Sequence, residues 1–182
     1  DVFVPISERP LAYRDTPLAI GAGQTISQPY IVALITEALR LQPDDRVLEV
    51  GGGSGYQAAV LAEMVPKGNV VTVELVRSLA ERARETLSEL EYRNIVVEDS
   101  SNDLGCSWRG PYDAIVVSAA MPRLSASLIG QLAVGGRMVA PVGDLELQEL
   151  VCVRRTGEGI SIRMLGPCRF VPLLGREAFP SS

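Results

Sequence analysis

The sequence predicts an α/β fold with a mostly parallel sheet of seven strands that ends in an antiparallel hairpin. From residue 46 onward, short apolar stretches alternate with helical patterns, as they do when helices connect parallel strands. A glycine-rich turn follows the first of these stretches and leads into a helical one, as in nucleotide-binding units. Only residues 156–159 separate the last two stretches, which favours a hairpin.

The length and composition fit one globular domain of 182 residues, and no apolar run is long enough to span a membrane. A net charge of −5 argues against a general nucleic-acid-binding protein, which needs a basic face. The N-terminus is acidic and lacks the pattern of a signal peptide. We expect a cytoplasmic, monomeric protein that binds neither nucleic acid nor membranes.

Residues 1–27 are predicted to form an arm, and residues 28–182 the core of the domain. The start of the arm is rich in proline and turn residues and shows no periodicity, so most of it is expected at the surface. A helix is expected over residues 28–41, with Ser27 as a natural N-cap and Pro29 in the first turn. Its predicted core face consists of Ile31, Leu34, Ile35 and Ala38.

The rest of the chain alternates between expected strands and helices. The strands are predicted at residues 46–50, 69–74, 94–98, 113–118, 137–141, 149–155 and 160–165. The helices are predicted at residues 57–64, 78–90 and 125–132. A mostly parallel sheet that finishes in a hairpin is the outline of the Rossmann-like class I methyltransferase fold, whereas the dinucleotide-binding fold continues with helices.

The glycine-rich turn, residues 51–55, reads Gly-Gly-Gly-Ser-Gly. Glycines allow positive φ and a close approach of the backbone to a ligand, and the next helix offers unpaired N–H groups. Counted from Gly53, the pattern G-x-G-x-x-A through Ala58 fits a dinucleotide site. Counted from Gly51, it is the looser G-x-G-x-G turn that methyltransferases use for S-adenosylmethionine (SAM). A P-loop is excluded because no Gly-Lys-Ser/Thr follows.

Two details favour SAM over NAD. Gly51 directly follows the predicted strand, where the first functional glycine is expected. Glu49 places a carboxylate at the end of that strand, where it would attract an amine-bearing or cationic ligand and repel a pyrophosphate. The next strand ends in Glu74, whose two oxygens suit the hydroxyls of a ribose. An adenosine-type cofactor is therefore expected, with NAD as the alternative to SAM.

The carboxyl ends of the first four predicted strands should meet at one edge of the sheet. This arrangement gathers the glycine-rich turn, Glu74, Asp99 and residues 118–120. Asp99 could accept a hydrogen bond from an adenine amino group. A single carboxylate at a strand end is often merely solvated, but the whole set in this order favours cofactor binding.

Histidine is absent from the sequence, which excludes a serine or cysteine nucleophile that relies on histidine and also histidine-containing zinc sites. Cys106, Cys152 and Cys168 are odd in number and lack C-x-x-C spacing, so reduced thiols are expected. No metal site is predicted.

Residues 23–29 read Gly-Gln-Thr-Ile-Ser-Gln-Pro. A helix start explains part of this segment, but the preceding glycines could also hold the Ser27 hydroxyl over the cofactor cleft. The segment is similar to one found in the protein-L-isoaspartate O-methyltransferase family. The resemblance extends over nearly the whole chain and includes residues 12–18, 47–62, 112–120, 131–143 and 169–173.

The resemblance implies transfer of a methyl group from SAM, with S-adenosyl-L-homocysteine as product, to the α-carboxylate of L-isoaspartyl residues in damaged proteins or peptides. It implies that Ser27 is the catalytic residue. Together with the patterns above, it assigns cofactor binding to Thr25, Ile26, Glu49, Gly51, Gly53, Ser54, Gly55, Glu74, Leu75 and Asp99. It assigns substrate binding to Ser27, Ala119, Ala120 and Val171.

Three stretches depart from the family pattern. The family usually has Gly-Asp-Gly where residues 98–100 are Glu-Asp-Ser, so the loop over residues 98–105 is expected to differ on the adenine side. Residues 118–120 replace Thr-Ala-Ala, and residues 121–125 replace a more proline-rich turn. Two alternatives therefore stay open: a carboxyl methyltransferase for a dedicated aspartyl peptide or small acid, and a SAM-binding protein without catalysis.

Overall fold

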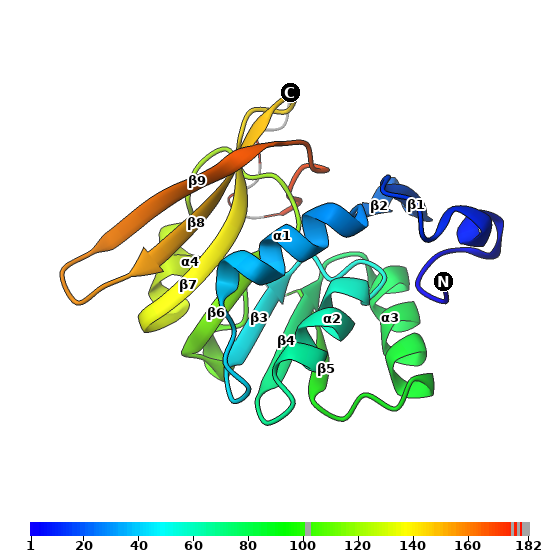
Figure 1. Ribbon diagram of the computed structural model, residues 1–182, viewed down its shortest axis with the longest axis horizontal. Helices are drawn as coiled ribbons and strands as arrows, with labels where there is room; N and C mark the ends of the chain where they lie inside the picture. The colour runs from blue at the N-terminus through cyan, green and yellow to red at the C-terminus, as the bar shows by residue number, and fades with distance from the viewer. Residues whose placement is uncertain (101–102, 176, 178, 180–182) are drawn as a thin grey trace.

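The computed structural model describes residues 1–100, 103–175, 177 and 179 of the chain. A seven-stranded sheet forms its centre, with α1 and α2 in front of it and α4 behind (Figure 1). A two-stranded sheet lies in the N-terminal arm. The predicted α/β class is confirmed.

The secondary structure follows the predicted order. The strands are β1 (Leu18–Gly21), β2 (Gln24–Ile26), β3 (Arg46–Val50), β4 (Asn69–Glu74), β5 (Ile95–Asp99), β6 (Tyr112–Val117), β7 (Leu132–Gly143), β8 (Gln148–Arg155) and β9 (Ile160–Cys168). The helices are α1 (Pro29–Leu39), α2 (Tyr56–Met64), α3 (Arg77–Glu89) and α4 (Ala126–Gln131), with the 3-10 helices η1 (Ile6–Leu11) and η2 (Ser107–Arg109).

The strand order of the large sheet is β5-β4-β3-β6-β7-β8-β9. The strands from β5 to β7 pair in parallel, whereas β8 and β9 pair antiparallel, which confirms the predicted terminal hairpin. At the carboxyl end of β3, Val50 lies opposite Val73 of β4 and Val117 of β6. The ends of these three strands therefore meet at one edge, where ligands bind in open parallel sheets.

β7 begins earlier than predicted, because residues 132–136 belong to it. Leu132 pairs with Tyr112, and the register then shifts before Arg137 pairs with Ala114. Gly135 lies within this irregular stretch and has a φ of 89°. Adjacent glycines such as Gly135 and Gly136 usually indicate a break in a strand. In this protein they allow a bulge within β7.

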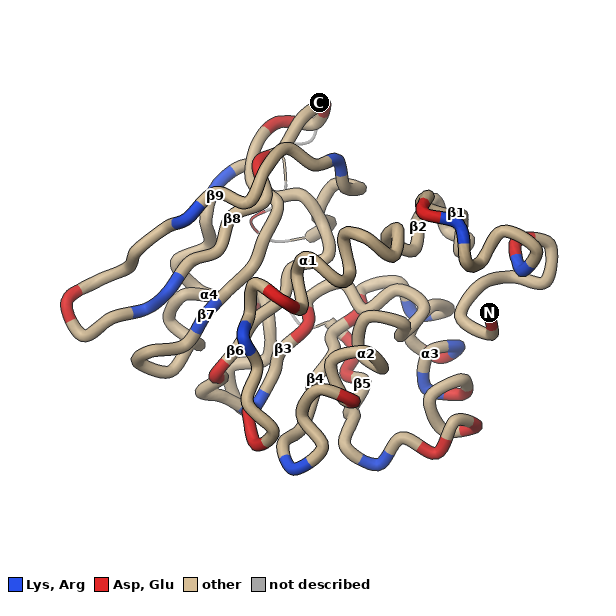
Figure 2. Tube along the Cα trace, in the orientation of Figure 1, with Lys and Arg blue, Asp and Glu red and all other residues tan. Residues whose placement is uncertain are grey.

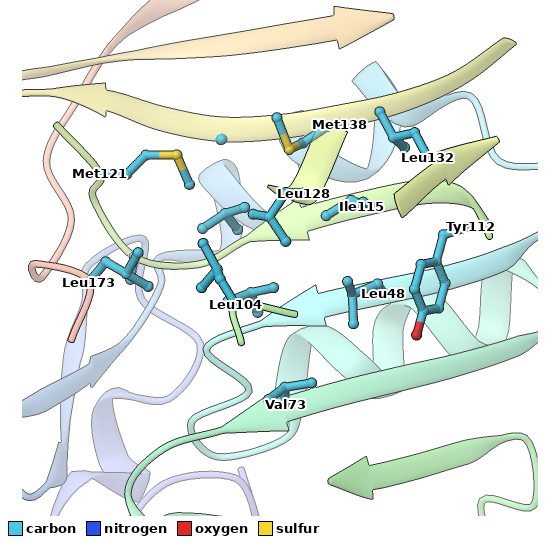
Figure 3. Packing of buried hydrophobic residues seen from close by; sticks show 14 of the residues in the cluster. Leu48, Val73, Leu104, Tyr112, Ile115, Met121, Leu128, Leu132, Met138 and Leu173 are labelled. Atoms are coloured by element: carbon cyan, nitrogen blue, oxygen red, sulfur yellow. The ribbon is translucent and has the colours of Figure 1, made fainter. Parts of the chain in front are cut away.

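The core has one part on each face of the sheet. The neighbouring β3 residues Val47 and Leu48 are both 0% exposed. Leu48 belongs to a cluster that includes Leu128 of α4 (Figure 3). Val47 belongs to a second cluster with Ile35 of α1 and Leu61 of α2. Burial of successive residues is typical of parallel strands covered on both faces, and it fixes the strand ends that form the site.

The arm contains more regular structure than predicted. β1 and β2 form an antiparallel hairpin whose turn contains Gly21, Ala22 and Gly23, all with positive φ. Leu18 and Ile20 are 6% and 1% exposed, so alternate residues of β1 face the protein interior. Most of the arm is exposed or only partly buried, as expected, and Leu18 and Ile20 are exceptions within this hairpin. Two inward residues are too few to give a recognisable period in the sequence.

α1 begins at Pro29, and its N-cap is Gln28, without a side-chain capping hydrogen bond. The predicted capping role of Ser27 is therefore wrong. Ile31 and Leu34 lie at the margin of the core and are only partly buried. The fully buried face of α1 consists of Val32, Ile35, Ala38 and Leu39.

Among the described residues, no helix combines the length and apolar character that a membrane span requires. The three cysteines, Cys106, Cys152 and Cys168, are buried and free. Across the residues that the structure describes, no group of three or more Cys, Asp or Glu side chains is arranged to hold a metal ion. Acidic and basic residues alternate along α3, whereas most other elements carry few charges (Figure 2).

Candidate active site

A cleft opens where the carboxyl ends of β3, β4 and β6 meet. We call it the main cleft; it contains ≈ 640 Å³ of space, its open mouth included. Its lining consists of Ile20, Gln24, Thr25, Val50, Gly51, Gly53, Val73, Glu74, Leu75, Val76, Ser100, Leu104, Gly105, Ser118, Ala119, Val171, Pro172, Leu173 and Leu174.

Two smaller hollows adjoin the main cleft and share Thr25 and Ser118 with it. The turn hollow is lined by Ile20, Thr25, Ile26, Ser27, Val32, Glu49, Gly51, Gly52, Gly53, Ser54, Tyr56, Gln57 and Ser118. The serine hollow is lined by Pro17, Thr25, Ser27, Gln28, Ile31, Ser118, Arg169, Phe170 and Val171. A ligand in one hollow would therefore lie beside a ligand in the main cleft.

The glycine-rich turn wraps around the end of β3 and leads into α2. Gly51, Gly53 and Gly55 have positive φ, and Gly55 is the N-cap residue of α2. The N–H groups of Gly51 and Gly52 donate to the carbonyl oxygen of Val73 at 2.9 and 3.2 Å. These bonds fix the turn against β4, and the structure thus gives it the conformation that the sequence predicts.

Replacement of Gly52 by alanine is expected to destabilise the protein. A Cβ at this position would lie 2.2 Å from Thr72 Oγ1, a hydroxyl that donates a 2.7 Å hydrogen bond to Glu49 Oε2. Relief of the clash requires the turn or the hydroxyl to move, at a cost of about 1–3 kcal/mol. Urea unfolding would measure this loss. Gly130→Ala is the control, because its added Cβ would meet nothing within 4 Å. Equal midpoints for both variants would contradict the prediction.

Glu74 lines the main cleft with a carboxylate that two backbone groups hold in place. Its Oε2 accepts from Gly53 N, and its Oε1 accepts from Val76 N, both at 2.7 Å. Each carboxylate oxygen can accept more than one hydrogen bond. The two oxygens therefore keep capacity for hydroxyl groups of a ligand, as expected for a ribose site. Leu75, the next residue, also lines the cleft.

Glu49 lies on β3 beneath the turn and is 0% exposed. It accepts hydrogen bonds from Thr72 Oγ1 at 2.7 Å and Ser118 Oγ at 3.5 Å. The pKa of Glu49 is raised to about 8, chiefly by burial; the hydrogen bond from Thr72 opposes the rise, the charge of Glu74 contributes to it, and the hydrogen bond from Ser118 also opposes it. Because Glu49 lines the turn hollow, a cation bound there would favour its ionised form.

The segment after β2 brings three predicted site residues to the junction of the cleft and hollows. Thr25 lines the main cleft and both hollows, and Ile26 lines the turn hollow. Ser27 lines both hollows but not the main cleft. Within the described residues the Ser27 hydroxyl has no hydrogen-bond partner. It is therefore available to a ligand in the serine hollow. Ser54 lines the turn hollow.

The predicted substrate segments lie side by side. Ala120 N donates to the carbonyl oxygen of Val171 at 2.8 Å, and Leu173 N donates to the carbonyl oxygen of Ala120 at 2.7 Å. Ala119 and Val171 line the main cleft. Ala120 is 0% exposed and lines neither the cleft nor the hollows, so in this structure it positions the neighbouring segment.

Asp99 is another predicted site residue that lines neither the main cleft nor the two hollows. Its carboxylate forms a 2.9 Å ion pair with Arg84 of α3. Ser100, Leu104 and Gly105 line this side of the main cleft instead. Residues 101 and 102 of the altered loop lie outside the described residues. The adenine contact of Asp99 stays a prediction.

Sequence reasoning missed several residues of the site, and two of them bear on its geometry. Ile20 lines the main cleft and the turn hollow, although its segment lacks a recognisable period. Thr72 lies opposite Glu49 in the parallel register and hydrogen-bonds to it. A signal for Thr72 was present, because it is the single polar residue between Val70 and Val73 in an apolar strand.

The fold and the cleft define a class I methyltransferase: the glycine-rich turn, the acid at the end of β4 and the antiparallel end of the sheet occur together. The chain belongs to the protein-L-isoaspartate(D-aspartate) O-methyltransferase family, whose model matches residues 1–178. It is 52% identical over 178 residues to the protein-L-isoaspartate O-methyltransferase of Pelotomaculum thermopropionicum, covering 97% of this chain and 77% of that protein. It is 51% identical over 181 residues to that of Rhodopseudomonas palustris, covering 98% and 82%.

Solved structures show the same similarity. A protein-L-isoaspartate O-methyltransferase matches 97% of this chain with a TM-score of 0.87 and 30% identity, and this chain spans 58% of its length. A putative protein-L-isoaspartate O-methyltransferase from Plasmodium falciparum, in complex with S-adenosyl-L-homocysteine, matches with a TM-score of 0.76 and 25% identity. The match covers 93% of this chain and 83% of that one. The Rossmann-like methyltransferase fold predicted from the sequence is confirmed.

Proposed function

We propose that this chain transfers the methyl group of SAM to the α-carboxylate of L-isoaspartyl residues in proteins or peptides. The observation that carries the proposal is the junction at Thr25 and Ser118, where the hollow of Ser27 meets the main cleft. An acceptor held at Ser27 would lie beside a donor held by the glycine-rich turn. Relatives that are 52% and 51% identical carry the name of this enzyme, which supports the assignment.

The residues of the main cleft and turn hollow fit SAM. The Glu74 carboxylate suits the ribose hydroxyls, and the turn allows close approach of the ligand to the backbone. Once a bound cation favours its ionised form, Glu49 would provide a negative charge for the amine-bearing end of the molecule. When bound, SAM supplies an electrophilic methyl group on a sulfonium.

The acceptor chemistry agrees with a chain that contains no histidine. A carboxylate has a pKa of about 4 and is already ionised at neutral pH, so no general base is needed. The protein must instead align one carboxylate oxygen with the methyl group. In this role, the Ser27 hydroxyl donates a hydrogen bond to the other carboxylate oxygen and does not act as a nucleophile.

A methyl-transfer assay with labelled SAM and paired peptides tests the proposal. The peptides have the same sequence and differ only in an isoaspartyl or aspartyl linkage. We expect the kcat/KM of the isoaspartyl peptide to be at least about tenfold higher, because a site that is built around one placement of the carboxylate disfavours the other.

Two other outcomes would favour different functions. Equal or faster methylation of the aspartyl peptide or of a small acid would support a dedicated carboxyl methyltransferase, an alternative suggested by the changed residues 98–105. Calorimetric binding of SAM without transfer to any peptide carboxylate would contradict catalysis altogether.

A further inference from the structure

The serine hollow contains a charged side chain that the assignment of Ser27 does not use. Arg169 is the one charged residue among the described residues that line this hollow. It follows β9, on the side of the hollow formed with Phe170 and Val171. A hollow proposed to receive a carboxylate therefore has a single cation in its wall.

The backbone on both sides of Arg169 is anchored. Cys168 is 9% exposed at the end of β9. Phe170 N donates a 2.8 Å hydrogen bond to Gln148 Oε1, and Gln148 is itself 1% exposed. The position of Arg169 is thus fixed by its neighbours rather than by its own side chain.

The Arg169 side chain is exposed and has no ion pair or hydrogen bond with any other described residue. Two acidic groups lie close to the hollow. Asp15 already accepts hydrogen bonds from Tyr30 N at 2.9 Å and Gln28 Nε2 at 3.4 Å. Glu49 is fully buried behind Ser118. The Arg169 guanidinium is therefore available to an anion that enters from solvent.

We propose that Arg169 is a specificity-determining residue that recognises the negative charge of the acceptor carboxylate. The inference rests on the proposed function. In the transfer, a bond forms between a carboxylate oxygen and the methyl carbon, and the sulfur–carbon bond breaks with its electron pair remaining on sulfur. The acceptor changes from an anion to a neutral ester, so its attraction to Arg169 is present in the bound substrate and absent in the product.

This charge change determines which kinetic constant Arg169 affects. The acceptor still carries much of its negative charge at the transition state, so the attraction to Arg169 is nearly equal in the bound substrate and in the transition state. Such uniform binding lowers KM without raising kcat. Arg169 should therefore favour capture of the substrate and permit release of the neutral ester. A guanidinium can also bind both oxygens of a carboxylate, which an ammonium cannot do in the same geometry.

The test is steady-state kinetics of R169Q, R169K and R169E on an isoaspartyl peptide. R169Q should raise the KM for the peptide about tenfold, as expected for loss of one charge-assisted contact at an exposed site. R169K should recover part of this loss, and R169E should exceed it. The kcat and the KM for SAM should stay within about twofold, because only binding of the acceptor is changed.

Salt dependence provides a second readout that a structural role would not alter. The kcat/KM of the parent chain should fall as salt is raised, and R169Q should show a weaker dependence. R154Q is the control: Arg154 is an exposed arginine of β8 that lines neither the main cleft nor the two hollows, and its substitution changes the net charge equally.

The outcomes distinguish the inference from the proposed function. If the parent chain methylates the isoaspartyl peptide and R169Q has an unchanged KM, the inference is wrong and the function stands. A loss of kcat with a lower melting temperature in both R169Q and R169K would assign Arg169 a structural role and also overturn the inference. If the parent chain itself transfers no methyl group, the proposed function fails instead.

Discussion

At about pH 8, the Glu49→Gln variant is expected to resist unfolding better than the parent chain. Burial raises the pKa of Glu49 from 4.5 to about 8, so the folded protein keeps this acid protonated where the unfolded chain ionises it. The contribution of Glu49 to stability is therefore complete below an unfolded pKa of about 4.5 and is lost as the pH rises through about 8. Glutamine has nearly the same shape and does not ionise, so it removes this loss.

Urea unfolding at two pH values would measure the effect. The advantage of E49Q over the parent chain should grow by about 3 kcal/mol between about pH 5 and pH 8. Glu158→Gln is the control, because Glu158 is exposed in the turn between β8 and β9. A difference between E49Q and the parent chain that does not change with pH would contradict the buried, protonated state.

The same substitution should weaken binding of SAM at neutral pH by about tenfold or more, because an ionised Glu49 would attract the amine-bearing end of the ligand. Binding should then release up to one proton, which calorimetry in two buffers of different ionisation enthalpy would detect. E49Q should release none. Ionisation of Glu49 would thus lower the stability of the fold and strengthen ligand binding. This is a trade-off between stability and function.

The parallel part of the fold could be predicted from the sequence because its strands are buried on both faces. Predominantly apolar stretches such as residues 70–73 and 114–117 are the signal for that environment. The β1–β2 hairpin and the early start of β7 could not be predicted in the same way. Their conformations depend on tertiary packing of Ile20 and on a bulge at Gly135, which local patterns do not record.

The parts of the site that depend only on the path of the backbone could be predicted from the sequence. Parallel strands end together, so the glycine-rich turn and Glu74 had to be neighbours. The direction of a side chain follows no such rule. Asp99 lies beside Glu74 in the register, but its carboxylate pairs with Arg84. The position of Ser27 also depends on the hairpin before it, which the sequence did not reveal.

Replacement of Ser27 by alanine should lower kcat on an isoaspartyl peptide by about a hundredfold, the usual cost when one positioned hydrogen-bond donor or the alignment it maintains is lost. The hydroxyl has no partner among the described residues and lines the serine hollow. The affinity for SAM should change by less than about twofold, because Glu74 and the glycine-rich turn remain intact.

Melting temperature separates this role from a structural one. If the Ser27 side chain capped α1, its removal would cost about 1 kcal/mol of stability. The N-cap is Gln28, without a side-chain capping bond, so the S27A variant should melt with the parent chain. Ser161→Ala on the exposed part of β9 is the matched control and should keep full activity. Unchanged kcat in S27A would refute the role of Ser27, whereas a lower kcat together with a lower melting temperature would point to damage of the hairpin–helix junction.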